Sequence, residues 1–228
     1  MLIVALLAAL LLLPLAGRAI LATAIVALAA LEWARLCGLK AWQSWVYVAA
    51  IVAALGAAYH NPWMPTFLVA TLFWIAVAPA WMWRGVSASH ARVLMVAGFV
   101  VLVPAALAMT VLSGVQVILV LTLVSLTDAG AYFAGSAFGK HKLAPSISPG
   151  KTREGAVGGL AAALVYAIIC GAFVEGIAWV PFLLSAFLIA VLSIVGDLFE
   201  SALKRQAGAT DSGRLLPGHG GALDRRVQ

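Results

Sequence analysis

The chain has 228 residues, of which 64% are hydrophobic and only 10% are charged. Its mean hydropathy is +1.09, whereas soluble proteins are roughly 45–50% apolar and about 25% charged. So few charged side chains exclude a water-soluble fold, and so much apolar surface excludes a disordered chain. The two cysteines are too few for a disulfide scaffold. The composition therefore predicts an all-α, polytopic integral membrane protein.

Apolar runs predict about eight transmembrane helices, because a spanning helix needs about 20 mostly apolar residues. We expect one membrane domain over residues 1–228, with apolar spans in 1–126 and a catalytic half in 127–228. The sixth span is short, and we expect that it can continue past Asp128. In chain order, the predicted spans are Leu2–Ala16, Ala19–Leu31, Trp42–Tyr59, Trp63–Trp83, Val93–Leu112, Val115–Leu126, Gly158–Val174 and Ile177–Leu198.

The positive charges give an independent test of these spans. Every Lys and Arg except Arg18 follows an even-numbered span. Cytoplasmic loops of membrane proteins carry an excess of Lys and Arg, so the pattern places these segments and the N-terminus in the cytoplasm. The net charge of +6 is then explained by topology and a basic cytoplasmic face, with no need for a nucleic-acid partner.

Acidic residues are concentrated in the second half of the chain, where Asp128 follows an apolar run. A carboxylate at membrane depth is costly and is a functional-site hypothesis by default. On a helix, Asp128, Tyr132, Gly135 and Gly139 share one face. Glycines alone favour a helix-packing face, whereas the acid on the same stripe favours a functional site.

Residues 140–155 contain two prolines and two glycines, which exclude a continuous helix. Ser148, Lys151, Thr152 and Arg153 supply the hydroxyl groups and cations that phosphate-binding loops use. The glycine spacing does not match a Walker A loop. From composition alone, a basic loop lying on anionic lipid headgroups is an equally good interpretation.

The last apolar span ends in a polar segment. Asp197, Ser201, Lys204 and Arg205 fall on one helical face, which pairs a carboxylate with cations. The chain after Arg205 is rich in glycine and could fold back over that face.

Two more carboxylates, Asp211 and Asp224, lie in this glycine-rich stretch. Carboxylates near Lys and Arg suit Mg²⁺ with bound phosphates, because Mg²⁺ uses one or two carboxylates plus phosphate oxygens. His219 could be a metal ligand or a general acid or base, or a turn histidine that donates a hydrogen bond.

These segments resemble the phosphatidate cytidylyltransferase (CDP-diacylglycerol synthase) family. The signature residues are Ser201, Lys204, Arg205, Asp211, Ser212, Gly213, Pro217, Gly218, His219, Gly220, Gly221, Asp224 and Arg225. The stripe from Asp128 to Gly139, the loop 148–155 and the segment 32–35 are also similar to the family. The resemblance is dense from about residue 127 onward and thin before it.

The resemblance implies transfer of CMP from CTP to phosphatidate, giving CDP-diacylglycerol and pyrophosphate. It implies Asp197 and Asp224 as ligands of Mg²⁺, with a monovalent cation such as K⁺ alongside. Catalytic candidates are Asp197, Asp224, Asp211, Lys204, Arg205 and His219. Substrate-binding candidates are Asp128, Ser148, Lys151, Thr152, Ser201, Gly220, Gly221 and Arg225. The expected partners are CTP, phosphatidate and membrane lipid, with a homodimer allowed.

The expected location is the bacterial inner membrane, with the site facing the cytoplasm. Three positions depart from the family pattern: Thr210 replaces a Lys, and Arg226 and Val227 replace an apolar residue followed by an Asp. The chain then ends at Gln228, where relatives continue into another helix, so an inactive or truncated member, or a membrane scaffold, is an alternative. A transporter is a further alternative, because Asp128 and Asp197 lie near membrane depth.

Overall fold

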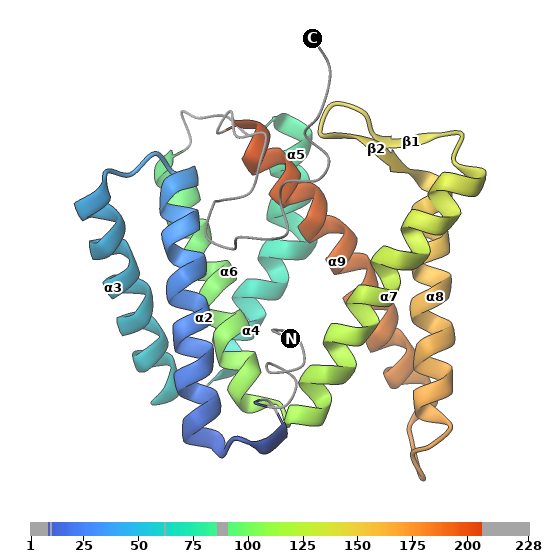
Figure 1. Ribbon diagram of the computed structural model, residues 1–228, viewed down its shortest axis with the longest axis horizontal. Helices are drawn as coiled ribbons and strands as arrows, with labels where there is room; N and C mark the ends of the chain where they lie inside the picture. Colours follow the sequence, from blue (N-terminus) through green and yellow to red (C-terminus); the bar gives the residue numbers. More distant parts are fainter. Residues whose placement is uncertain (1–8, 10, 62, 86–90, 207–228) are drawn as a thin grey trace.

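The computed structural model describes residues 9, 11–61, 63–85 and 91–206, and these residues form a helical bundle with one small hairpin (Figure 1). The long helices are α2 (Leu15–Leu36), α3 (Ala41–Tyr59), α6 (Ala91–Val111), α7 (Gly114–Phe138), α8 (Arg153–Gly171) and α9 (Trp179–Gln206). One further span consists of α4 (Trp63–Leu72), a π-helical turn η1 (Phe73–Val77) and α5 (Ala78–Arg84). The hairpin consists of β1 (Lys142–Ala144) and β2 (Ser148–Thr152).

Seven helices within the described part of the chain are long and apolar enough to cross a membrane. They correspond to the second through eighth predicted spans, so the polytopic all-α class is confirmed. Most of the first predicted span, Leu2–Ala16, lies outside the described residues. The sixth span continues past Asp128, as the sequence analysis allows, and ends at Phe138. The polar residues that it contains are tolerated because several of them line a cavity described below.

The hairpin was not predicted as a pair of strands. Residues 140–155 were expected only to interrupt the helices, and β1 and β2 in fact pair antiparallel, with Lys142 opposite Thr152 and Ala144 opposite Ser148. The hairpin lies at the end of the bundle where α7 ends and α8 begins (Figure 1).

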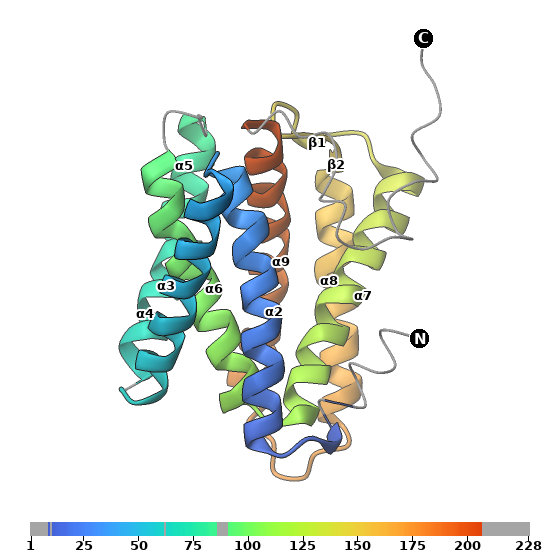
Figure 2. The same cartoon turned by 60° about the vertical axis from the view of Figure 1, so that its left-hand side comes forward.

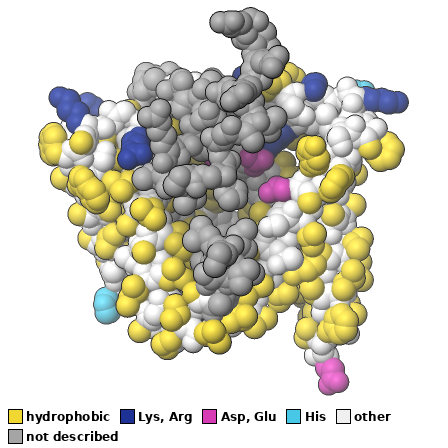
Figure 3. All heavy atoms as spheres, in the orientation of Figure 1, with side chains coloured by type: hydrophobic (Ala, Val, Ile, Leu, Met, Phe, Trp, Pro, Cys, Tyr) yellow, Lys and Arg dark blue, Asp and Glu magenta, His cyan; other side chains and the backbone are white. Residues whose placement is uncertain are grey.

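Positive side chains gather at the hairpin end of the bundle. Arg35, Arg84 and Lys204 all lie in the last turn of a helix that ends there, and Figure 3 shows Lys and Arg along the corresponding edge of one face. Arg18 lies at the opposite end, where its Nη1 donates to the Leu112 carbonyl oxygen at 2.7 Å. The described cations are therefore distributed between the two ends as the sequence predicts.

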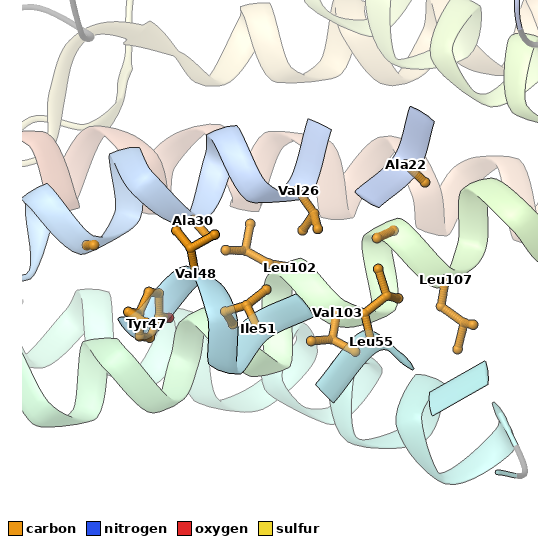
Figure 4. Packing of buried hydrophobic residues seen from close by; sticks show 12 residues of the cluster. Ala22, Val26, Ala30, Tyr47, Val48, Ile51, Leu55, Leu102, Val103 and Leu107 are labelled. Atoms are coloured by element: carbon orange, nitrogen blue, oxygen red, sulfur yellow. The ribbon is translucent and has the colours of Figure 1, made fainter. Parts of the chain in front are cut away.

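The first core cluster joins α2, α3 and α6, and Figure 4 shows its interdigitating side chains. Two polar side chains reinforce it. The indole Nε1 of Trp33 donates to the Leu94 carbonyl oxygen at 2.8 Å, and the Tyr47 hydroxyl donates to the Met95 carbonyl oxygen at 2.9 Å. Both reach α6 beside Gly98, where an added Cβ would overlap them. This cluster packs α2, α3 and α6 together into one apolar unit.

Helix α9 contacts both parts of the bundle, namely η1 and α5 on the one hand and α7 and α8 on the other (Figure 2). Its buried Phe199 makes edge-to-face contacts with Phe73 and Trp74, with ring centroids 5.7 and 5.6 Å apart. The π-helical turn that presents these rings precedes Pro79, which has no N–H to donate within a helix. The aromatic contacts therefore fix the rotation of α9 about its axis.

That rotation determines where Asp197 points. Successive residues of an α-helix are about 100° apart around the axis, so side chains two positions apart lie on nearly opposite faces. With Phe199 turned towards η1, Asp197 faces α7 and the hairpin, and it lines the cavity described next.

Candidate active site

A cavity of about 590 Å³ lies where the hairpin meets α7, α8 and α9. The side chains that give it polar chemistry are Asp128, Tyr132, Ser136, Lys151, Thr152 and Asp197. They come from three segments that are distant in sequence, and the fold brings them together near the basic end of the bundle. The rest of the wall is mostly apolar and includes Leu143 and Ile194.

Helix α7 contributes both kinds of residue that its stripe predicts. Asp128, Tyr132 and Gly135 all line the cavity. Gly135 and Gly139 also lie against Thr152, whose side chain an added Cβ would meet at about 3.0 Å. The stripe is therefore both a helix-packing face and part of the cavity, because its glycines allow close packing and its acid faces the cavity.

Thr152 connects the hairpin to α8. It is buried, and its Oγ1 accepts a hydrogen bond from the Gly155 backbone N–H at 3.1 Å, which caps the helix. The next turns of α8 place Gly155, Gly158 and Gly159 against α7, where any added Cβ would collide with backbone or Cβ atoms. The cavity therefore has a closely packed wall.

Asp197 and Lys151 form an ion pair across the cavity, between Oδ2 of Asp197 and Nζ of Lys151. The Lys151 side chain is 27% exposed and the Asp197 side chain is 50% exposed, so water or a ligand can reach the carboxylate. The predicted pairing of Asp197 with cations of its own helical face differs from this arrangement, because the hairpin supplies the nearest cation.

The other polar residues of α9 have partners elsewhere. Ser201 donates to the Asp197 backbone carbonyl oxygen at 2.9 Å, and Lys204 pairs with Glu200 at 2.5 Å. Arg205 Nη1 donates to the Ser146 carbonyl oxygen in the hairpin turn at 3.1 Å. Lys204 and Arg205 therefore lie at the same end of the bundle as the cavity without lining it in the described structure.

One predicted site residue on the hairpin does not line the cavity. Ser148 lies at the start of β2, opposite Ala144. The remaining candidates all lie outside the described residues: Asp211, His219, Gly220, Gly221, Asp224 and Arg225. Their roles remain predictions.

Ser136 is not among the predicted site residues, but it also lines the cavity. Its spacing provides a signal, since it lies four residues after Tyr132 and eight after Asp128 on the same helix face. The position of Ile194 in the cavity wall could not be predicted from the sequence, because an apolar residue in an apolar span does not indicate which way it faces.

The donor set of the cavity is compatible with a hard divalent cation. The described residues contain no cluster of three or more His, Cys, Asp or Glu that could hold a metal. Mg²⁺, however, uses only one or two carboxylates and completes its shell with phosphate oxygens and water. Asp128 and Asp197 line the same cavity, so the residues fit an ion that arrives with a phosphate ligand.

These features define a polytopic membrane protein with a carboxylate- and lysine-lined cavity at the basic end of its spans. Comparisons with known proteins agree with this class. The family model described as "Cytidylyltransferase family" matches residues 1–226. The chain belongs to this family, whose members are nucleotidyltransferases.

Three relatives named phosphatidate cytidylyltransferase illustrate the similarity. The protein of Pseudomonas aeruginosa is 41% identical over 220 residues, covering 89% of this chain and 79% of that protein. The protein of Haemophilus influenzae is 49% identical over 111 residues, covering 46% of this chain and 38% of its own. The protein of Bacillus subtilis is 51% identical over 100 residues, covering 43% and 37%, respectively. The prediction of the family from the sequence is confirmed.

Proposed function

We propose that this protein is a phosphatidate cytidylyltransferase, which transfers CMP from CTP to phosphatidate and releases pyrophosphate. Family membership and the relative that matches along most of the chain support the activity. The observation in the structure that carries the proposal is the cavity in which Lys151 and Asp197 pair beside Asp128. It combines a cation for phosphate oxygens with carboxylates for a metal ion.

The reaction requires positioning and charge neutralisation more than a protein nucleophile. A phosphate oxygen of phosphatidate attacks the α-phosphorus of CTP, and the bond from that phosphorus to the oxygen bridging to the β-phosphate breaks. Pyrophosphate leaves with the bonding electrons. Lys151 is placed to neutralise phosphate oxygens at the Asp197 carboxylate, and such preorganised charges are usually the largest contribution to catalysis of this kind.

Mg²⁺ belongs to the proposal. Asp197, together with Asp224 outside the described residues, would hold the ion, and Asp128 lies in the same cavity. When bound, a divalent ion neutralises the reacting phosphates and orients them for in-line displacement. A monovalent cation such as K⁺ beside it is part of the same expectation, as is a homodimer.

The proposed location is the bacterial inner membrane, with the hairpin end of the bundle in the cytoplasm. This orientation follows the positive-inside rule applied to the described cations. It also gives the cavity access to CTP, which is dissolved in the cytoplasm.

Cysteine labelling tests the orientation. We expect Ser146→Cys, in the exposed hairpin turn, to resist a membrane-impermeant maleimide on intact cells and to react after permeabilisation. Glu175→Cys, between α8 and α9, should react on intact cells. The background replaces Cys170 and Cys37 with Ala, although burial already raises the pKa of the Cys37 thiol to about 11. Rapid labelling of Ser146→Cys from outside would reverse the proposed topology.

Reconstitution tests the activity. The purified protein is placed in liposomes that contain phosphatidate, and labelled CTP is added with Mg²⁺ or with a chelator. Formation of CDP-diacylglycerol and pyrophosphate only when both substrates and Mg²⁺ are present supports the proposal. Absence of product would favour an inactive member or scaffold. Movement of a substrate across the bilayer without product would favour a transporter.

A further inference from the structure

The hairpin that carries Lys151 needs external support. Its strands contain only three and five residues, and their register shifts between Lys142 and Ala144. Two short strands alone are marginally stable. The position of Lys151 relative to Asp197 therefore depends on what holds the hairpin to the helices.

Glu154, in the first turn of α8, forms hydrogen bonds with the residues that begin the hairpin. Its carboxylate oxygens accept hydrogen bonds from the backbone N–H groups of Lys140 at 3.2 Å and His141 at 3.2–3.3 Å. The His141 ring Nδ1 lies 2.6 Å from Glu154 Oε1. In return, the Arg153 N–H donates to the His141 carbonyl oxygen at 2.8 Å. These bonds tie the link between α7 and β1 to the start of α8.

The other end of the hairpin is held to α9. Arg205 donates to the Ser146 carbonyl oxygen in the turn. Lys151 lies between the two anchors, three residues before Glu154, and its Nζ reaches Asp197. The carboxylate of Glu154 thus holds the residues just before β1, and β1 pairs with the strand that carries Lys151.

We propose that Glu154 is a positioning residue, which clamps the hairpin so that Lys151 meets Asp197 across the cavity. The catalytic consequence rests on the proposed function, whereas the clamp itself does not. A simpler role would be to stabilise the N-terminus of α8, where a negative side chain interacts favourably with the helix dipole. That role predicts fraying of α8, whereas the clamp predicts loosening of the hairpin.

Hydrogen exchange separates these roles. Glu154→Gln removes the charge and one acceptor oxygen from the clamp, and Glu175→Gln makes the same change at the opposite end of α8. In the full-length protein in detergent micelles, we expect Glu154→Gln to accelerate amide exchange at residues 140–152 by about tenfold or more. Exchange in the first two turns of α8 and in the middle of α7 should remain at the parent rate. Glu175→Gln should match the parent throughout.

A kinetic cycle tests the link to Lys151. Glu154→Gln should lower kcat for CDP-diacylglycerol formation by about 10- to 100-fold, as loss of a supporting partner usually does. In a Lys151→Met background, the same change should have little further effect, because there is no ammonium left to position. Independent, multiplicative losses would overturn the positioning role.

Other outcomes are equally decisive. Unchanged exchange in Glu154→Gln, or acceleration spread evenly over α7 and α8, would overturn the clamp. If Glu154→Gln does not fold, Glu154→Asp keeps the charge but shortens its reach, and the same local acceleration is expected. If the parent forms no product, the proposed function fails, and the exchange experiment still decides whether Glu154 clamps the hairpin.

Discussion

Replacing Asp197 with Asn is expected to reduce CDP-diacylglycerol formation by more than about 100-fold. Changes to the partners of metal ligands typically cost 10- to 100-fold, and loss of a ligand itself should cost more. The substitution keeps the size of the side chain, so the contacts of α9 should persist, but it leaves the Lys151 ammonium without its counterion. Initial rates in liposomes, measured over a Mg²⁺ titration, check this prediction.

Two controls make the result specific. Asp197→Asn should insert into membranes and elute from a sizing column as the parent does. Glu175→Gln, which removes a negative charge far from the cavity, should retain the parent rate. A near-normal rate for Asp197→Asn at saturating Mg²⁺ would show that its carboxylate is not a metal ligand.

Replacing Gly158 with Ala should lower the free energy of unfolding by about 1–3 kcal/mol, the usual cost of overpacking a tight contact. The added Cβ would lie well inside van der Waals contact of the Ala134 Cβ, and the Gly130 carbonyl oxygen is 3.1 Å away. Because these atoms belong to or adjoin the backbone, α7 and α8 must separate. Denaturant or thermal unfolding in detergent measures the loss.

A matched substitution is available at Gly56 in α3, where an added Cβ meets nothing within 4 Å. Gly56→Ala should leave stability unchanged or raise it by up to about 1 kcal/mol, because Ala is the better helix former. Equal effects at the two glycines would contradict a close contact between α7 and α8.

The spans were predictable because the membrane imposes a simple rule on composition. Long apolar runs and the alternation of cations identify the helices from residue 15 onward, although hydropathy stops at Leu126 and the helix continues to Phe138. Hydropathy fails there because polar residues that face a cavity lower the average without ending a helix. The hairpin was not predicted, since Pro and Gly signal only the absence of a helix.

The site was predictable in its parts but not in its pairings. Asp128 and Asp197 are identifiable because a carboxylate at membrane depth is energetically costly and therefore indicates a functional site. Helical periodicity directed Asp197 towards Lys204, whereas the fold pairs it with Lys151. A contact between residues 46 positions apart depends on how α9 is rotated by Phe199, and no local pattern encodes that rotation.

The placement of the cavity at the basic end of the spans has a kinetic consequence for the proposed reaction. One substrate diffuses in three dimensions through the cytoplasm, and the other diffuses only within the plane of a leaflet. The surface density of phosphatidate, rather than its amount per volume, then governs how often the cavity is filled. The two products also separate between phases, because pyrophosphate dissolves in water and the liponucleotide stays in the bilayer. The enzyme would therefore couple a substrate dissolved in the cytoplasm to a substrate confined to the membrane surface.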